Sequence, residues 1–463
     1  MEDVRDYPYK VVYATPGFLE EKGFGRVAHL PVVMDHRPRY HRHANQFLID
    51  VGLGEWSVTT RGKEVAAALP PSTVTMKDYA AWLANYLEYC HRRGKDPLKA
   101  DYLVEIAQGY QGEMLSGSWS RDNRPLSAKT VNCRVELVCA YQLWAVDKGL
   151  RGPFRIPKVR KTFIKDSPRS SGGTTTVSVE GRRGKARESK RRLGLPDEKI
   201  IGAWLRRLYE KSATEGLIAE TILETAIRRA EAAAWRVDTL PLNADDWAVV
   251  NQDRPLEHQS VLVTLRYGTK GTEYGHDHGD KIGPEGKIHV PMPLALKLHA
   301  YRQKMRPKAL TIALRRAKNT REAEALRRDT VHLFLHPDTG QRYSGQQIYD
   351  FWTAPDIECP RGWHPHLGRD FWACSVLWKH VVAQQQLVEH VIKAGADPSV
   401  LKILAVDLEG FIERSIKPQL RHLSRDTSLL YLQWVSDRLN VNLNLTESYM
   451  KLIEEEAVDE DDE

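Results

Sequence analysis

Apolar residues recur at helical spacing in the segment that follows residue 70. One face of the first expected helix is formed by Tyr79, Trp82, Leu83, Tyr86 and Cys90. This spacing of three, four, seven and eleven residues is typical of one side of an α-helix. A second helix is expected to begin near Ser127 and to end before Gly149. The pattern therefore predicts a small helical domain over residues 71–157.

A longer second region combines helical periodicity with short strand-like runs. Helices are expected at 199–214, 217–235 and 309–328, the last of them strongly basic. Runs that favour strands occur at 247–250, 261–265 and 288–291. The pattern predicts a mainly α chain whose second domain, over residues 196–450, is α+β with a small sheet.

Charge is distributed unevenly along the 463 residues. The net charge of +7 rises to +15 when the last ten residues, which carry eight carboxylates and no base, are left out. Residues 158–192 hold twelve bases and three acids around a run of Ser, Gly and Thr, which is typical of a linker. We therefore expect a basic interdomain linker at 158–195, either solvated or in contact with a phosphate backbone, and a disordered acidic tail at 451–463.

Composition argues against several classes of protein. No run approaches ~18 apolar residues, so no membrane span is expected. The start at Met1 is acidic and lacks an apolar segment, which argues against a secretory signal. The five cysteines form no CxxC pair, so neither a disulfide framework nor a zinc ribbon is expected, and a cytoplasmic location fits. Residues 1–70 are interpreted as a separate N-terminal segment, with an arm or accessory DNA-binding region as one option.

Three separated segments place Arg or His in an ordered, apolar context. They are Thr225-Ala-Ile-Arg228-x-x-Glu231, His366-x-x-Arg369, and His422 followed by Tyr431 nine residues later. Each motif alone has an ordinary explanation, because Arg228 and Glu231 could form a simple i, i+3 ion pair and Tyr431 could belong to a core. Their joint occurrence in this order is much less expected by chance.

Together these motifs resemble the boxes of the tyrosine recombinase (phage integrase) family. The resemblance covers roughly residues 71–435, in the family's order. It implies a helical core-binding (SAM-like) domain at 71–157, followed by an α+β catalytic domain with a small antiparallel sheet. The family also has an active-site lysine in a β-hairpin between the first two boxes, and Tyr267-Gly-Thr-Lys270-Gly looks like that hairpin.

The two arginines suit a phosphodiester under attack, which gains negative charge as it becomes a pentacoordinate phosphorane. Arg228 and Arg369 would hold its non-bridging oxygens with the bidentate geometry that a guanidinium provides. The resemblance implies a further hydrogen bond from His422 to the same oxygens. Charge stabilisation of this kind in a preorganised site is usually the largest catalytic contribution.

Tyr431 is the expected nucleophile, and its phenol needs a nearby base or cationic field because the ordinary pKa of tyrosine is about 10. His366 is our choice for the base, and Lys270 for the acid that protonates the leaving 5′-oxygen. The stretch after Lys270 is extended and rich in glycine, so Lys281 and Lys287 are alternatives for the acid. By resemblance, the product is a 3′-phosphotyrosyl link that keeps the bond energy for rejoining, so no cofactor or metal is expected.

Some features depart from the family pattern. They are Ala226 and Arg421, where the family commonly has glycine, and Asp370, where many members have histidine. Arg369 and His422 are 53 residues apart, which indicates an extra helical insertion at 378–417. These departures favour, as an alternative, a catalytically inactive DNA-binding relative.

A cluster of histidines and aspartates offers another interpretation. His276, His278 and Asp280, together with His366, could serve a metal-dependent phosphohydrolase. The first three lie in a Gly-rich hairpin without an apolar shell, so a solvated turn is the preferred interpretation. A relaxing topoisomerase of type IB would share the tyrosine chemistry.

The resemblance implies a site-specific DNA recombinase or integrase that acts in the integration, excision or transposition of a mobile element. Its partner would be double-stranded DNA with specific, inverted-repeat sites. Four protomers would assemble on two such sites and exchange strands through a Holliday junction, with accessory proteins as further candidate partners. The sequence predicts neither the DNA site nor the direction of exchange.

Overall fold

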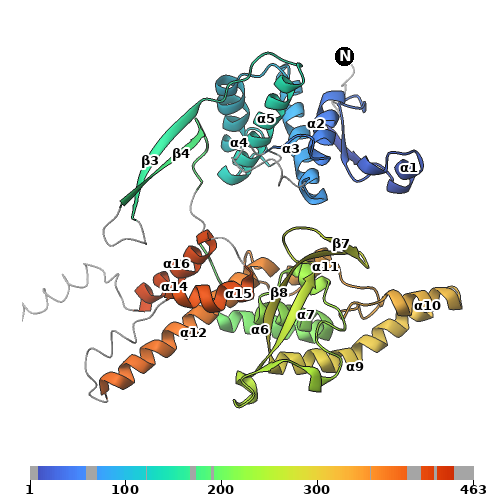
Figure 1. The fold of residues 1–463 in the computed structure, drawn as a ribbon, viewed down its shortest axis with the longest axis vertical. Helices are drawn as coiled ribbons and strands as arrows, with labels where there is room; N and C mark the ends of the chain where they lie inside the picture. The colour runs from blue at the N-terminus through green and yellow to red at the C-terminus, as the bar shows by residue number, and fades with distance from the viewer. Residues whose placement is uncertain are drawn as a thin grey trace, which may run out of the picture. The chain divides into compact units, whose positions relative to one another are not determined.

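The chain divides into two units, Met1–Lys190 and Arg191–Glu463, each with its own hydrophobic core. This computed structural model describes residues 9–58, 70–120, 122–166, 174–188, 192–354, 356–393, 408–421 and 425–442. Helices dominate both units, and the sheets are small and antiparallel (Figure 1). The predicted mainly α class with a small antiparallel sheet is thus confirmed. In the described parts of the chain, no helix is long and apolar enough to cross a bilayer.

The first unit contains a two-stranded sheet and a bundle of helices. Its elements up to residue 147 are β1 (Lys10–Tyr13), α1 (Pro16–Glu21), η1 (Gly25–Val27), β2 (Pro31–Met34), α2 (Arg42–Gly52), α3 (Thr73–Arg92), η3 (Tyr102–Tyr110), α4 (Gln111–Ser116) and α5 (Ala128–Asp147). The limits predicted for α5 are confirmed. The side chain of Ser127 accepts a hydrogen bond from the amide of Thr130, and Gly149, at a φ of 68°, follows the last turn.

The helix α2 shares one core with α3 and α5. Phe47 is fully buried, and its ring meets those of Tyr141 and Trp144 edge-on, with centroids 5.3 and 5.6 Å apart. The indole of Trp144 donates a hydrogen bond to the Asp50 carboxylate at 2.9 Å. The structure therefore differs from the expected separate segment at 1–70, because the apolar face of α2 is covered by the helical bundle.

The basic segment that we expected to be a linker contains a long β-hairpin. Its strands β3 (Lys158–Asp166) and β4 (Thr174–Arg182) pair antiparallel (Figure 1). β4 is rich in Thr and Val, and β3 carries Val, Thr, Phe and Ile between its charged residues; all of these favour a strand. Arg182 ties the base of the hairpin to the helices of the first unit. Its guanidinium donates, at 3.0, 2.9 and 2.9 Å, to Tyr102, Gln111 and Asn132.

The second unit is built on a four-stranded antiparallel sheet. The strands, in the spatial order β5-β6-β8-β7, are β5 (Val249–Val250), β6 (Ser260–Tyr267), β7 (Gly275–Asp277) and β8 (Asp280–Pro291). The helices up to residue 352 are α6 (Glu198–Lys211), α7 (Ala213–Thr225), α8 (Arg229–Ala233), η4 (Ala244–Asp246), η5 (Leu256–His258), α9 (Met292–Arg315), α10 (Thr320–Asp329) and α11 (Gly345–Trp352). The three predicted strand runs are confirmed by β5, β6 and β8.

Two expected helices are interrupted. The helix predicted at 217–235 ends at Thr225 and resumes as α8, because Ala226 adopts a left-handed conformation with a φ of 55°. The basic helix predicted at 309–328 is divided between α9 and α10, and the side chain of Asn319 caps the start of α10. A break of a few residues barely changes the spacing of apolar positions, so periodicity does not reveal it.

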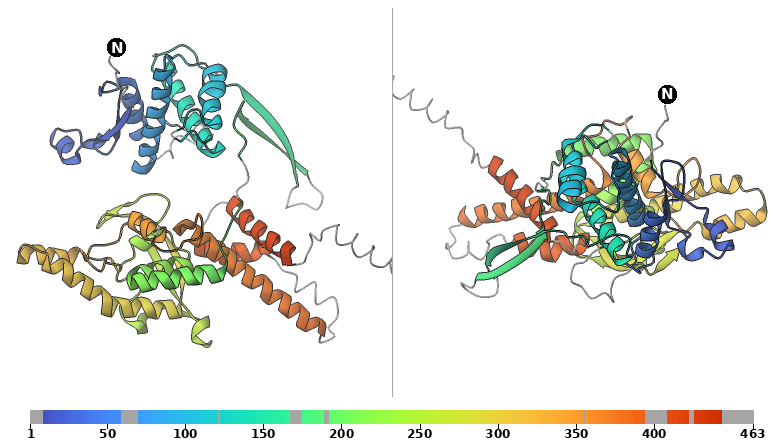
Figure 2. Two further views of the ribbon diagram at one scale, coloured as in Figure 1. Left: turned by 180° about the vertical axis from the view of Figure 1, so that it is seen from behind. Right: turned by 90° about the horizontal axis from the view of Figure 1, so that it is seen from above.

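The last helices pack around a second apolar cluster of this unit. They are α12 (Pro365–Lys393), α14 (Leu408–Phe411), η6 (Ile412–Ile416), α15 (Lys417–Leu420) and α16 (Arg425–Asn442). α16 packs against α12 (Figure 2). The insertion expected at 378–417 is helical up to Lys393 and again from Leu408. Residues 394–407, and the tail at 451–463, lie outside the described residues.

Candidate active site

The break after α7 creates the turn on which the site is built. Ala226 is buried and left-handed, and Arg228 becomes the N-cap residue of α8. A left-handed alanine costs roughly 1 kcal/mol relative to glycine. The turn also leaves the Ala226 carbonyl outside the helical ladder, where it accepts a hydrogen bond from the guanidinium of Arg369. The two arginines predicted to hold phosphate are thus attached to the same turn.

The carboxylate of Glu231 accepts hydrogen bonds from two arginines, Arg228 and Arg421. Together with Arg369, these residues are called the arginine cluster below. Glu231 is 1% exposed and accepts hydrogen bonds from the backbone amide and Nη1 of Arg228 at 2.7 and 2.8 Å. It also accepts a hydrogen bond from Nη2 of Arg421, which lies 190 residues away in the chain. The Arg228–Glu231 pair is therefore part of a buried tertiary network and not an ordinary ion pair on a helix surface.

Arg369 is fully buried in α12. It donates through Nη1 to the carbonyl of Ala226 and through Nη2 to the carbonyl of Leu420. Both acceptors are neutral, and the more distant Glu231 favours its charge electrostatically. Burial, together with repulsion from Arg228, lowers the pKa of Arg369 to about 9, and the guanidinium stays protonated at neutral pH. A buried cation held mainly by carbonyl groups is costly unless an anion joins it.

Arg421 brings a third guanidinium to the same place. It ends α15 in a left-handed conformation with a φ of 51°, and its side chain is 14% exposed. The aliphatic part of the side chain lies against Gly286 of β8, and Nη2 reaches Glu231. Burial lowers the pKa of Arg421, while attraction to Glu231 opposes that shift. Arg228 and Arg421 therefore share one carboxylate, and Arg369 lies within electrostatic range of all three groups.

Gln419 docks α15 on the edge of β8. Its side-chain oxygen accepts from the amide of His289 at 2.8 Å, and its side-chain nitrogen donates to the carbonyl of His289 at 2.9 Å. The same nitrogen donates to the carbonyl of Thr225 at 2.9 Å. This side chain pairs with β8 as a neighbouring strand would, and it fixes the position of Arg421 two residues later.

The expected nucleophile, Tyr431, is 1% exposed and belongs to the apolar cluster of the C-terminal helices. Its hydroxyl donates a hydrogen bond to Oδ1 of Asp370 at 3.0 Å. Burial and the Asp370 carboxylate raise the pKa of Tyr431, whereas attraction to Arg369 lowers it in part. The mutual electrostatic influence of Tyr431 and Arg369 places the hydroxyl near the arginine cluster.

Of the two histidines predicted for the site, the structure describes His366 but not His422. His366 is exposed in the first turn of α12, and its ring lies parallel to that of His364, with centroids 6.4 Å apart. A phenol has one proton to donate, and here that proton is directed to Asp370 and not to His366. His422 lies outside the described residues, so its role stays a prediction.

The three candidate lysines lie on the β6–β8 part of the sheet. Lys270 is exposed in the turn between β6 and β7, and Lys287 is exposed in β8. The ammonium of Lys281 donates to the carbonyl of Gly271 at 2.6 Å. This backbone contact restrains Lys281, which favours Lys270 or Lys287 as a mobile acid.

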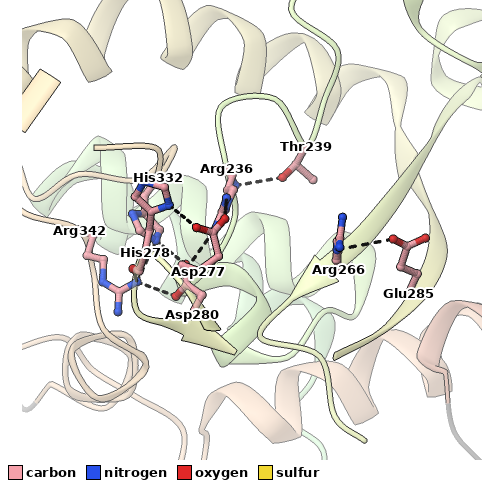
Figure 3. A network of polar contacts seen from close by, with 9 residues as sticks. All are labelled: Arg236, Thr239, Arg266, Asp277, His278, Asp280, Glu285, His332 and Arg342. Atoms are coloured by element: carbon pink, nitrogen blue, oxygen red, sulfur yellow. Dashed lines mark hydrogen bonds and ion pairs between the residues drawn. The ribbon is translucent and has the colours of Figure 1, made fainter. Parts of the chain in front are cut away.

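Polar contacts fix the β7–β8 end of the same sheet, which contains the metal ligands of the alternative interpretation, His276, His278 and Asp280. Asp277 pairs with Arg236 at 2.7 Å, and Asp280 pairs with His332 and Arg342 at 2.6 Å each (Figure 3). Burial alone would raise the pKa of Asp280, but these partners lower it. Residues in the described ranges contain no group of three side chains suited to hold a metal ion. The arrangement instead clamps the β7–β8 hairpin to neighbouring loops.

The structure brings three residues into the site to which the sequence patterns assign no role. They are Glu231, Asp370 and Arg421. Glu231 is part of the first motif, and the other two are departures from the family pattern. The departures at Asp370 and Arg421 are the sequence signal that could have identified these two residues. A charged residue at a position where glycine or histidine is common needs a partner when it is buried.

Solved structures of two recombination proteins are among those similar to this chain. XerA recombinase matches at 13% sequence identity and a TM-score of 0.30, over 87% of this chain and 97% of that chain. The Tn1549 transposon integrase with circular intermediate DNA matches at 11% identity and a TM-score of 0.42, over 84% and 94%. The same integrase with transposon right end DNA matches at 10% identity and a TM-score of 0.31, over 77% and 99%.

No family model matches the sequence, and no curated protein matches it. The chain is thus similar to solved recombinase and integrase structures at very low identity.

Proposed function

We propose that this protein breaks and rejoins DNA strands through a covalent 3′-phosphotyrosyl intermediate, as a DNA recombinase of the tyrosine type. The observation that carries the proposal is the grouping of three arginines: Arg228 and Arg421 both contact Glu231, and Arg369 lies within electrostatic range of them and of Tyr431. Two guanidiniums paired with one carboxylate, and a third held by carbonyl groups nearby, leave an excess of positive charge. A phosphodiester would supply the missing anion and accept several guanidinium hydrogen bonds at once.

The arginine cluster suits the transition state better than the substrate. A phosphodiester carries one negative charge, and the phosphorane formed on attack carries more. Arg369 is buried, and its partners, the carbonyls of Ala226 and Leu420, fix it before substrate arrives. Preorganised charge in a site that excludes water acts most strongly where new charge develops.

The proposed step exchanges one phosphate ester for another. A bond forms between the Tyr431 oxygen and phosphorus, and the bond from phosphorus to the 5′-oxygen breaks. The phenolic proton passes to Asp370, which already accepts its hydrogen bond, with His366 as the second candidate. The 5′-oxygen takes a proton from Lys270. Attack by a 5′-hydroxyl of another strand reverses these transfers, and the ester keeps the bond energy throughout.

The motif resemblance extends the proposal to an assembly on double-stranded DNA. Four protomers would bind two inverted-repeat sites and exchange strands through a Holliday junction, in the integration, excision or transposition of a mobile element. The basic β3–β4 hairpin supports DNA as the partner: Lys158 and Arg160 are 69% and 71% exposed and share one carboxylate, Glu180, so the group keeps a net positive charge. Exposed cations of this kind suit contact with a phosphate backbone.

Nicked suicide duplexes test the proposal. A nick beside the scissile phosphate lets the released fragment diffuse away, so a covalent adduct accumulates. Duplexes tiled across the DNA that flanks the coding gene would be incubated with the full chain. We expect a denaturant-resistant protein–DNA adduct with the natural protein and none with Tyr431→Phe. The matched control, Tyr349→Phe, alters an exposed tyrosine of α11 and should leave the yield unchanged. An adduct that survives Tyr431→Phe would contradict the proposal.

A second candidate function is a DNA-binding relative that does not cleave. The burial of Tyr431, and its hydrogen bond to a carboxylate, favour this candidate. Tyr431 at 1% exposure has to move with α16 before its oxygen can reach DNA. Sequence-specific binding to one of the tiled duplexes, without an adduct and unaffected by Tyr431→Phe, would support the second candidate over the first.

A further inference from the structure

The backbone of Arg421 has a conformation that arginine does not favour. Its φ of 51° lies in the left-handed region, where a side chain with a Cβ crowds the following carbonyl. Glycine is the usual residue at such a helix end. Arginine also lacks the short polar group that lets asparagine or aspartate hydrogen-bond locally there. An arginine at this position therefore needs a compensating role for its side chain.

The strand opposite Arg421 leaves space for this side chain. Gly286 of β8 has no Cβ, and a Cβ built there would lie 2.3 Å from Cδ of Arg421. Even alanine at 286 would therefore force the arginine out of its place. Arg421 stands where glycine is favoured, and Gly286 lies in the middle of a strand. Together these two unusual positions direct one guanidinium into the arginine cluster.

The guanidinium of Arg421 uses only part of its capacity for hydrogen bonds. Nη2 donates to Glu231, but Nε and Nη1 are buried and find no partner among the residues that the structure describes. Nε of Arg369 is also buried and finds no hydrogen-bond partner among the described residues. Buried donors without acceptors are rare and unfavourable in folded proteins. These donors sit on side chains that share the Glu231 cluster and repel one another.

We propose that Arg421 is a third phosphate-binding arginine, which holds a non-bridging oxygen of the scissile phosphate together with Arg228 and Arg369. This inference rests on the proposed function and assigns a substrate contact to a residue that replaces a glycine of the family pattern. Glu231 orients the guanidinium, and the phosphate provides the acceptors for Nε and Nη1. One further guanidinium also adds a positive charge where the phosphorane becomes more negative.

The alternative is that Arg421 only neutralises Glu231 and stabilises the fold. The two roles predict different behaviour of substitutions at one position. Arg421→Gly removes the guanidinium and relieves the left-handed backbone, while Glu231 keeps its two hydrogen bonds from Arg228. Arg421→Gln keeps a donor for Glu231 but removes the charge. A role confined to Glu231 would leave Arg421→Gln fully active, whereas a role in binding phosphate would not.

The first experiment measures adduct formation in single turnover on a suicide duplex. We expect Arg421→Gly and Arg421→Gln to slow it by ~100-fold or more, as for the loss of one charged transition-state donor. Replacing one non-bridging oxygen of the scissile phosphate by a methyl group removes the acceptor. On that methylphosphonate substrate the ratio of the rate of the natural protein to the rate of Arg421→Gly should approach one. Equal rates on the ordinary phosphate would overturn the inference while leaving the proposed function intact.

The second experiment does not depend on cleavage. Inorganic phosphate, compared with chloride at equal ionic strength, should raise the unfolding temperature of the full chain by binding the cluster. This increase should be lost in Arg421→Gly and retained in Arg342→Gly, which removes an arginine of the separate β7–β8 clamp. If phosphate stabilises Arg421→Gly as much as the natural protein, the inference is wrong. The absence of any adduct in the natural protein would count against the proposed function alone.

Discussion

The hydroxyl of Tyr431 donates its hydrogen bond to Asp370, and Asp370 is the residue directly after the buried Arg369. A carboxylate only accepts hydrogen bonds, so the direction of this bond is fixed from tyrosine to aspartate. The contact adds to burial in raising the pKa of Tyr431. The phenol is therefore neutral at pH 7, and its proton has to leave during attack on phosphorus and not before it.

Replacement of the acceptor tests which group takes that proton. Asp370→Asn keeps an oxygen that can accept the hydrogen bond but removes the basic charge, so we expect adduct formation to slow by roughly 10²–10⁴-fold. His366→Gln should slow it much less. Single-turnover rates between pH 6 and 9 provide the measurement. The residual rate of Asp370→Asn should rise with pH, because hydroxide then has to take the proton. The opposite ranking of the two variants would return the role of base to His366.

Removal of the central carboxylate should destabilise the second unit. In Glu231→Ala, Arg228 and Arg421 lose their shared partner while they remain partly or largely buried. We expect the free energy of unfolding to fall by about 3–5 kcal/mol, as for other buried ion pairs from which one member is removed. Denaturant titration measures the change. Glu285→Ala is the matched control, since Glu285 is 61% exposed and lies 3.7 Å from Arg266. Its expected effect is below ~1 kcal/mol.

The packing of Arg421 on Gly286 predicts a coupled pair of substitutions. Gly286 does not lie in the left-handed region, so Gly286→Ala acts through contact with the arginine and not through backbone strain. Alone it should lower stability by about 1–3 kcal/mol. In an Arg421→Gly background the same change should be nearly neutral, which gives a coupling energy that a double-mutant cycle measures from denaturant midpoints. Additive effects would show that the two residues do not contact each other.

A pair of acids on α7 predicts a pH dependence of stability. Burial, together with repulsion from Glu220, raises the pKa of Glu224 to about 7. In the unfolded chain a glutamate titrates near ~4.3, so between these values the folded state binds the extra proton. Stability from this group is present below pH ~4.3 and is lost as the pH rises through 7. Glu224→Gln should therefore stabilise the protein at pH 8 and have little effect at pH 4. Urea midpoints at the two pH values provide the measurement, and an equal effect at both would contradict the assignment.

Much of the local structure follows from the sequence. Apolar spacing and the Ser127 cap predict α5, and runs of β-branched residues predict the strands of the main sheet. The order of the motifs also predicts which arginines belong together. The sequence predicts a linker in place of the β3–β4 hairpin, because the basic composition of this segment outweighed the strand preference of its β-branched residues. Local pattern and composition conflicted there, and pairing between the two strands decided the outcome.

The sequence by itself determined the chemistry available to this protein: two motif arginines, a tyrosine, and the helices that carry them. Only the tertiary structure decided which groups meet. Arg369 reaches the Ala226 carbonyl across 143 residues, and Arg421 reaches Glu231 across 190. The break at Ala226 and the left-handed turn at Arg421 are unfavourable locally, and long-range hydrogen bonds offset their cost. No pattern of neighbouring residues contains such bonds, because their partners are brought together only when the core forms.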